Sequence, residues 1–220
     1  MPKITPILPF PPYPPVRPGF PSSQFEHFND RVTGDLPWTE MDFKSVSDTL
    51  YSRTISGRVQ TRSFSMQYFE WKAVFTPLTH TEFKPVYAFA HSQSGRLQAF
   101  TVTLPGMAHQ GSITTGTATG TIGSRQLTVS ATGTLKAGDL ISFNDDTNEH
   151  YKVYMVQDDV TISGSGDVNI FPGLLKAPSS ATFYTGQDVK FLARMKNDVQ
   201  TYNLSTDGFY RYEIEMEETF

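Results

Sequence analysis

The most regular feature of the chain is an alternation of apolar and polar residues that predicts long β-strands. Within residues 67–75, Phe69, Trp71, Ala73 and Phe75 occupy every second position, and the charged residues Glu70 and Lys72 lie between them. Residues 189–195 and 210–217 alternate in the same way. Successive side chains of a strand point to opposite faces, so each segment is expected to bury one face and expose the other.

One short helix is predicted between these strands, over residues 79–94. Thr79 and Glu82 have the spacing of a capping box, apolar residues follow at helical spacing, and Gly95 ends the pattern. Pro85 would remove a hydrogen bond inside a helix, so the first turn is expected to be separate. Residues 97–104 then predict another strand.

The middle of the chain has a different style, with much Gly, Thr and Ser and only short alternating segments. Strands are predicted over residues 127–131, 139–143, 151–157, 160–163 and 168–171. Strands of this length, separated by turn residues, are typical of a small barrel or sandwich. We therefore expect a mainly β protein in which a host β domain, residues 46–106 and 182–220, is interrupted by a small β domain, residues 107–181.

Residues 1–45 are interpreted as an N-terminal arm of the first domain. The first 23 residues hold nine of the fifteen prolines, which excludes helix and central strand and favours an extended, polyproline-like segment. Three roles stay open for this arm: folding back on its own domain, lying on a neighbouring subunit, or binding a proline-reading domain.

Composition and charge exclude several classes of function. The chain has no cysteine, and hence no disulfide, thiolate metal site or cysteine nucleophile. A net charge of −4 with scattered Lys and Arg argues against specific nucleic-acid binding. The N-terminus does not have the pattern of a signal peptide, and no run approaches the roughly 20 apolar residues needed to span a bilayer.

No catalytic, metal or cofactor site is predicted, and the chain is expected not to be an enzyme. The five histidines lack the spacing of metal ligands and are expected to be packing, cap or surface residues; they are His27, His80, His91, His109 and His150. The acidic positions are expected to be turn residues, namely Asp30, Asp145, Asp146, Glu149, Asp158 and Asp159. A calcium site is not expected at the turn that contains Asn148, because this turn lacks the alternating ligand positions and the central glycine of an EF-hand. The glycine- and threonine-rich residues 111–123 lack the following helix of a phosphate site.

Two stretches resemble the distal tail protein (Dit-like) family of long-tailed bacteriophages. The first, residues 69–100, contains Phe69-Glu70-Trp71, Pro77-Leu78-Thr79, Pro85-Val86-Tyr87 and Gly95-Arg96-Leu97. It is similar to the ring domain of that family. The second joins Ala137-Gly138-Asp139, Lys152-Val153-Tyr154 and Pro172-Gly173-Leu174. It resembles an inserted β domain of tail and baseplate proteins that is like an oligonucleotide/oligosaccharide-binding (OB) fold, although Gly173 replaces the usual second proline.

The resemblance implies a virion structural protein, made in the host cytoplasm and located at the tail tip. It implies a hexameric ring of copies of the chain. This ring is expected to contact the tail tube protein and the baseplate hub protein. In such a ring, Glu213, Glu215 and Glu217 are candidates for an acidic lumen wall that repels DNA phosphates. The alternative is a solvated face of an amphipathic strand.

Two other functions stay open at this point. The inserted domain offers Tyr151, Tyr154 and Phe171 as aromatic residues for a carbohydrate-binding module that recognises host glycans, although they lie among apolar residues and fit a core equally well. The chain could instead be another virion protein, such as a tail-tube or decoration protein.

Overall fold

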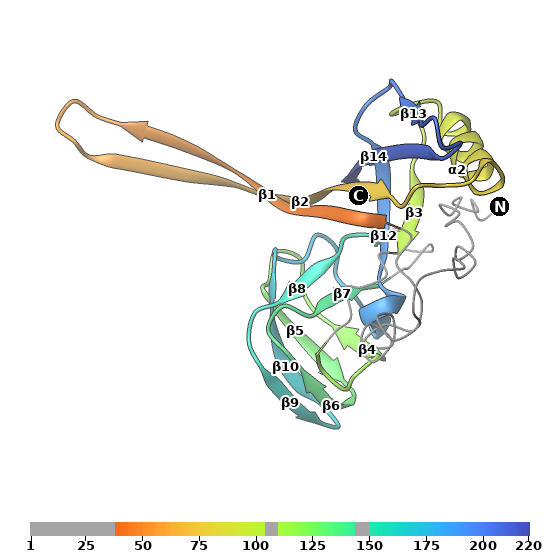
Figure 1. Cartoon of the computed structure of the whole chain (residues 1–220). Coiled ribbons are helices and arrows are strands. Elements are labelled where there is room, and N and C mark those ends of the chain that lie inside the picture. The colour runs from red at the N-terminus through yellow and green to blue at the C-terminus, as the bar shows by residue number, and fades with distance from the viewer. Residues whose placement is uncertain (1–37, 104–109, 144–149) are drawn as a thin grey trace.

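Over the residues that the structure describes, the protein is mainly β, with one α-helix, an open sheet and a closed barrel (Figure 1). The structure, a computed structural model, describes residues 38–103, 110–143 and 150–220, without the side chains of residues 38 and 63–65. The predicted fold class is therefore confirmed. Within the part of the chain that is described, no helix is both long and apolar enough to cross a membrane.

The open sheet has the strand order β1-β2-β14-β12-β3, and β13 pairs with β14 only. Its strands are β1 (Trp38–Arg53), β2 (Val59–Phe75), β3 (Phe100–Thr103), β12 (Lys190–Met195), β13 (Tyr202–Leu204) and β14 (Tyr210–Glu218). All neighbouring strands are antiparallel. The sheet thus combines strands from both ends of the described chain.

The barrel closes through six antiparallel strands in the order β10-β5-β4-β11-β7-β8. These are β4 (Thr115–Thr119), β5 (Gln126–Ser130), β7 (Leu140–Ser142), β8 (Tyr154–Val156), β10 (Gly166–Phe171) and β11 (Ala181–Thr185). A separate pair is formed by β6 (Thr132–Leu135) and β9 (Val160–Ser163), and the short 3-10 turn η2 (Gly186–Asp188) leads into β12. An OB-fold has five strands, so the barrel differs from it in strand number.

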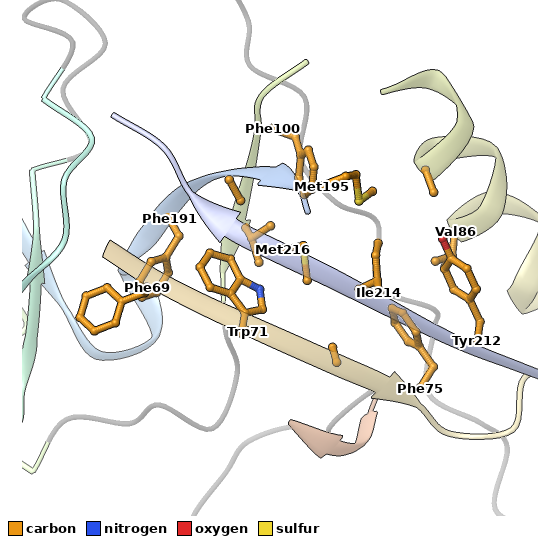
Figure 2. Close-up of a cluster of buried hydrophobic side chains, with 14 of the residues drawn as sticks. Phe69, Trp71, Phe75, Val86, Phe100, Phe191, Met195, Tyr212, Ile214 and Met216 are labelled. Carbon is orange, nitrogen blue, oxygen red and sulfur yellow. The ribbon is translucent and has the colours of Figure 1, made fainter. Parts of the chain in front are cut away.

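The alternating segments form the apolar core of the sheet, which Figure 2 shows from close by. Trp71 of β2 lies 5.2 Å from Phe191 of β12, and Phe75 stacks on Tyr212 of β14 at 5.9 Å between ring centroids. Aromatic pairs at these distances add to the free energy gained by burying their area. Residues of the barrel such as Val153 join this core, whereas the barrel interior forms a second cluster of its own.

Helix α2 (His80–Ser92) packs the apolar side chains of its inner face against this core. Its first turn is fixed by Thr79, whose backbone N–H and hydroxyl both donate to the Glu82 carboxylate, at 2.8 and 2.7 Å. The expectation of a separate first turn was wrong: the helix runs unbroken through Pro85, an exposed residue of its second turn. It ends at Ser92, and Gly95 adopts a positive φ of 65° in the turn that follows.

Several boundaries differ from those expected. β1 begins at Trp38, inside the stretch assigned to the arm, and its pairing with β2 is irregular between Trp38 and Glu40. β11 belongs to the barrel, although the expected domain boundary after residue 181 cuts through it, because Phe183 is part of the barrel core. β3 begins at Phe100 rather than at residue 97, since Leu97 lies in the exposed turn after the helix.

Two motifs that carry the resemblance have structural roles in the barrel. The buried Asp139 carboxylate accepts hydrogen bonds from the backbone N–H groups of Gln110, Gly111 and Lys136, at 2.8, 3.2 and 2.8 Å. Gly173 passes so close to another loop that a Cβ atom there would lie 2.8 Å from the carbonyl oxygen of Gly123. The departure from proline at this position therefore fits the close approach of two backbone segments.

Candidate functional site

Glu213, Glu215 and Glu217 of β14 lie on the face of the sheet opposite its apolar core. Ile214 and Met216, which alternate with them, are buried in that core, whereas Glu213 is exposed and Glu215 and Glu217 are partly exposed. The sequence-based prediction of one acidic and one apolar face of this strand therefore describes its geometry. Whether the acidic face borders a lumen stays a prediction.

The glutamates do not form a uniformly acidic surface, because neighbouring strands bring lysines beside them. Lys72 of β2 binds Glu213 at 2.8 Å, and Lys196 at the end of β12 binds Glu70 at 2.6 Å. These hydrogen bonds raise the pKa of both lysines. By strand register, the face as a whole carries charges of both signs. Its acidic residues are Glu40, Asp42, Glu70, Glu213, Glu215 and Glu217, and its basic residues are Lys44, Lys72, Lys190, Arg194, Lys196 and Arg211.

The hairpin formed by β1 and β2 projects far beyond the sheet (Figure 1). At about 3.3 Å per residue, the sixteen residues of β1 span roughly 50 Å. Every residue whose side chain is described between Ser47 and Arg62 is exposed, and the turn at the tip closes through bonds between Thr54, Gly57 and Arg58. Several of these exposed side chains are large and apolar, namely Leu50, Tyr51, Ile55 and Val59, and Met66 follows on β2.

A two-stranded hairpin is marginally stable by itself in water. Leu50 and Tyr51 are more than half exposed, at 53% and 63%, and Ile55 at the tip is fully exposed. Exposed apolar side chains gathered on one projecting element indicate a surface that another molecule covers. The hairpin also carries Arg53, Arg58 and Arg62 against a single acidic residue, Asp48, so its tip is locally basic. We call residues 47–66 the projecting hairpin.

A buried ion pair connects the sheet to the barrel. The side chains of Lys152, just before β8, and Glu218, at the end of β14, are 1% and 0% exposed, and the ammonium donates to the carboxylate. Glu218 also accepts from the backbone N–H groups of Val153 at 2.9 Å and Phe69 at 3.1 Å. The Glu218 carboxylate thus joins the end of β14 to β2 and to the segment before β8. These bonds fix the position of the barrel relative to the sheet.

The histidines take packing and hydrogen-bonding positions where the structure describes them. His80 Nδ1 is 2.9 Å from the Tyr210 hydroxyl, and His150 Nε2 is 3.0 Å from the Tyr154 hydroxyl. His91 packs edge-on against Tyr87. Among the described residues, no three side chains of the kinds that bind metals come together. His27, His109, Asp30 and the acidic turn with Asp145, Asp146, Asn148 and Glu149 lie outside the described residues.

The remaining acidic candidates are engaged in the barrel. Asp159 binds Lys136 at 2.8 Å and the backbone N–H of Ala137 at 2.9 Å, and the bond from Lys136 lowers the pKa of Asp159. Asp158 accepts from the amide of Asn169 at 2.9 Å. Both are therefore turn residues of the barrel, and the glycine-rich residues 111–123 contain β4 rather than a helix.

The three aromatic residues considered for glycan binding do not form one exposed platform. Tyr154 is fully buried, and its hydroxyl accepts from the Leu175 N–H at 3.1 Å. Tyr151 and Phe171 are half-buried, and Arg125 lies over the Phe171 ring at 5.3 Å. Sugars stack on exposed aromatic faces, so these positions do not favour the carbohydrate-binding alternative.

Sequence patterns missed the two features that stand out most, the projecting hairpin and the Lys152–Glu218 pair. The available signal for the hairpin was Ser56-Gly57, a turn dipeptide between two stretches rich in Ser, Thr and Arg.

Neither a protein-family model nor a curated protein sequence matches the chain.

Proposed function

We propose that this protein is a structural subunit of the tail tip of a long-tailed bacteriophage, where six copies form a ring between the tail tube protein and the baseplate hub protein. The observation that carries the proposal is the projecting hairpin, whose apolar side chains are exposed and are not covered by any described part of the chain. A hairpin that projects beyond the rest of its own subunit fits a head-to-tail interface, and such interfaces generate rings when the rotation closes.

The rest of the molecule suits a rigid building block. The buried Lys152–Glu218 pair and the shared apolar core hold the barrel on the sheet. In the ring, the barrel is placed outside and the mixed-charge face of the sheet toward the lumen, where a hydrated surface without a basic patch would let DNA pass. The motif resemblance to distal tail proteins supports this assignment, and no residue is assigned a catalytic role.

Light scattering over a concentration series, with negative-stain images, tests the ring. We expect a hexamer with a central hole, and we expect the triple variant Leu50→Ser, Tyr51→Ser and Ile55→Ser to remain folded but monomeric. Ile122→Ser is the control, because Ile122 is also a large exposed apolar residue (71%) but lies in a turn of the barrel region. The control should assemble like the unmodified protein.

Localisation tests the biological assignment separately. Antibody labelling of intact virions of the phage that encodes the chain is expected at the distal end of the tail. Labels along the tail would indicate a tube protein, labels on the head a decoration protein, and unlabelled virions would contradict a structural role.

A further inference from the structure

Helix α2 and β13 together present an aromatic surface that no described element covers. It consists of Phe83, Tyr87, Tyr202 and Tyr210 with His80 and His91 at its rim. Phe83 is its buried centre, stacked on Tyr210 at 4.3 Å and tilted against Tyr202 at 4.9 Å. Tyr202 is 48% exposed and its neighbour Leu204 54% exposed.

The N-terminal segment enters the described structure close to this surface. Trp38, the first residue of β1, pairs with Phe75, and the Phe75 ring stacks on Tyr212 at 5.9 Å. The Tyr212 ring in turn lies 5.9 Å from Phe83 and 6.0 Å from Tyr87. The segment before Trp38 therefore joins β1 close to the aromatic surface, because only the Phe75 and Tyr212 rings separate Trp38 from Phe83.

The sequence of this segment has a strict period of three. Proline occurs at every third position from 6 to 21, in the series Pro6, Pro9, Pro12, Pro15, Pro18 and Pro21. A second series with the same period is wholly apolar: Ile4, Ile7, Phe10, Tyr13 and Val16. A polyproline II helix has three residues per turn, so in that conformation each series would line one face. A segment that acted only as a spacer would not need a continuous apolar face.

From this juxtaposition we infer that residues 4–21 bind as a polyproline II helix to the aromatic surface of their own chain. Polyproline II segments bind aromatic-lined surfaces, where proline and apolar side chains pack on the ring faces. Their carbonyl groups have no internal partners, and Tyr and His side chains can donate to them. Residues 22–37 can reach across up to about 50 Å, which is ample for binding to the same chain.

Hydrogen exchange of the full-length protein tests this binding. In the variant Phe10→Ser with Tyr13→Ser, the amides of β13 and of the last turns of α2 should exchange about tenfold faster than in the unmodified protein. The matched control is Leu8→Ser with Phe20→Ser, which removes two large apolar side chains from the third series of the segment. We expect the control to exchange like the unmodified protein. Equal exchange in all three proteins would overturn the inference.

A synthetic peptide of residues 4–21 identifies the site and the occupant. It should bind the full-length Phe10→Ser, Tyr13→Ser variant, and Tyr202→Ala added to that variant should weaken binding at least tenfold, whereas Ile122→Ala should not. The unmodified protein should fail to bind the peptide at every protein concentration, because its own segment occupies the surface. Binding to the unmodified protein overturns the inference, and blocking that fades on dilution shows that the segment comes from a second copy instead.

Discussion

Lys152 and Glu218 are buried together, and each one makes the other tolerable in the core. Burial lowers the pKa of the Lys152 ammonium and raises the pKa of the Glu218 carboxyl, and the attraction between them opposes both changes. The ammonium also lies 5.0 Å from the Phe69 ring and 5.2 Å from the Phe220 ring. An isolated charge at this depth would lose its hydration without compensation.

Breaking this pair from one side should therefore cost more than removing both charges. We expect Lys152→Met to lower the free energy of unfolding by about 3–5 kcal/mol, because it leaves Glu218 buried and unpaired. Adding Glu218→Gln removes the unpaired charge and keeps one acceptor oxygen for either Phe69 or Val153, so it should recover part of that loss. Urea unfolding of both single variants and the double variant measures the coupling, and additive losses would show that the charges act independently.

Tyr154 gives the stability a dependence on alkaline pH. Burial raises the pKa of its hydroxyl from 10.0 to about 12, and it also raises that of Tyr212. Because the folded state keeps a proton that the unfolded state loses, stability is fully present below pH 10 and falls as the pH rises toward 12. The loss is about 1.4 kcal/mol per pH unit for each tyrosine.

Unfolding curves between pH 9 and 12 should show this slope, and Tyr154→Phe should reduce it. That variant also loses the hydrogen bonds to His150 and Leu175, so its stability at pH 7 is expected to be lower by about 1–2 kcal/mol. Tyr51→Phe, on the exposed hairpin, is the control and should keep the full slope. An unchanged slope in Tyr154→Phe would assign the alkaline loss to other groups.

At the scale of single elements, helix α2 contains a destabilising residue, Pro85. Pro85 offers no N–H to the carbonyl of Thr81, yet the helix continues because the capping box fixes its first turn. We expect Pro85→Ala to raise the free energy of unfolding by about 1–2 kcal/mol, since the gained bond outweighs the greater freedom of the unfolded chain. Thermal unfolding measures the change. Lys84→Ala, at the neighbouring exposed position, should stay within about 0.5 kcal/mol of the unmodified protein.

The success of sequence patterns differed between elements for a physical reason. β2, β12 and β14 were predicted because each buries one face in a shared core, which enforces alternation. β4 and β6 were missed, because they consist mostly of Thr and Gly, and Leu135 of β6 is the one large side chain in the two strands. The far half of β1 is exposed on both faces, so no burial shapes its sequence.

Candidate surfaces were predictable only where they share a strand. Glu213, Glu215 and Glu217 could be placed on one face from their spacing alone. The ion pairs on that face, Lys72 with Glu213 and Lys196 with Glu70, join residues of different strands. Glu218 binds Lys152, which lies 66 positions earlier in the sequence. Pairings of this kind depend on which strands become neighbours, and alternation within a strand carries no information about its neighbours.

At the scale of the whole molecule, the sheet and the barrel differ in how their strands are drawn from the chain. All barrel strands lie between residues 115 and 185, whereas the sheet needs strands from both sides of that segment. A chain cut after residue 205 should therefore keep the barrel and lose the sheet. Hydrogen exchange should show protected amides in β5, β7 and β10 and unprotected amides in β2, and protection of β2 would contradict this division.

The position of β14 also sets an order of events during synthesis on the ribosome. This strand comes after all other described strands in the sequence, yet it lies in the middle of the sheet, between β2 and β12. The nascent chain can complete its barrel before β14, the strand that pairs with β2, has been synthesised. Until then the apolar face of β2 is not fully covered. We expect that interval to be the vulnerable one, in which ribosome-associated chaperones shield an unfinished sheet until the closing strand emerges.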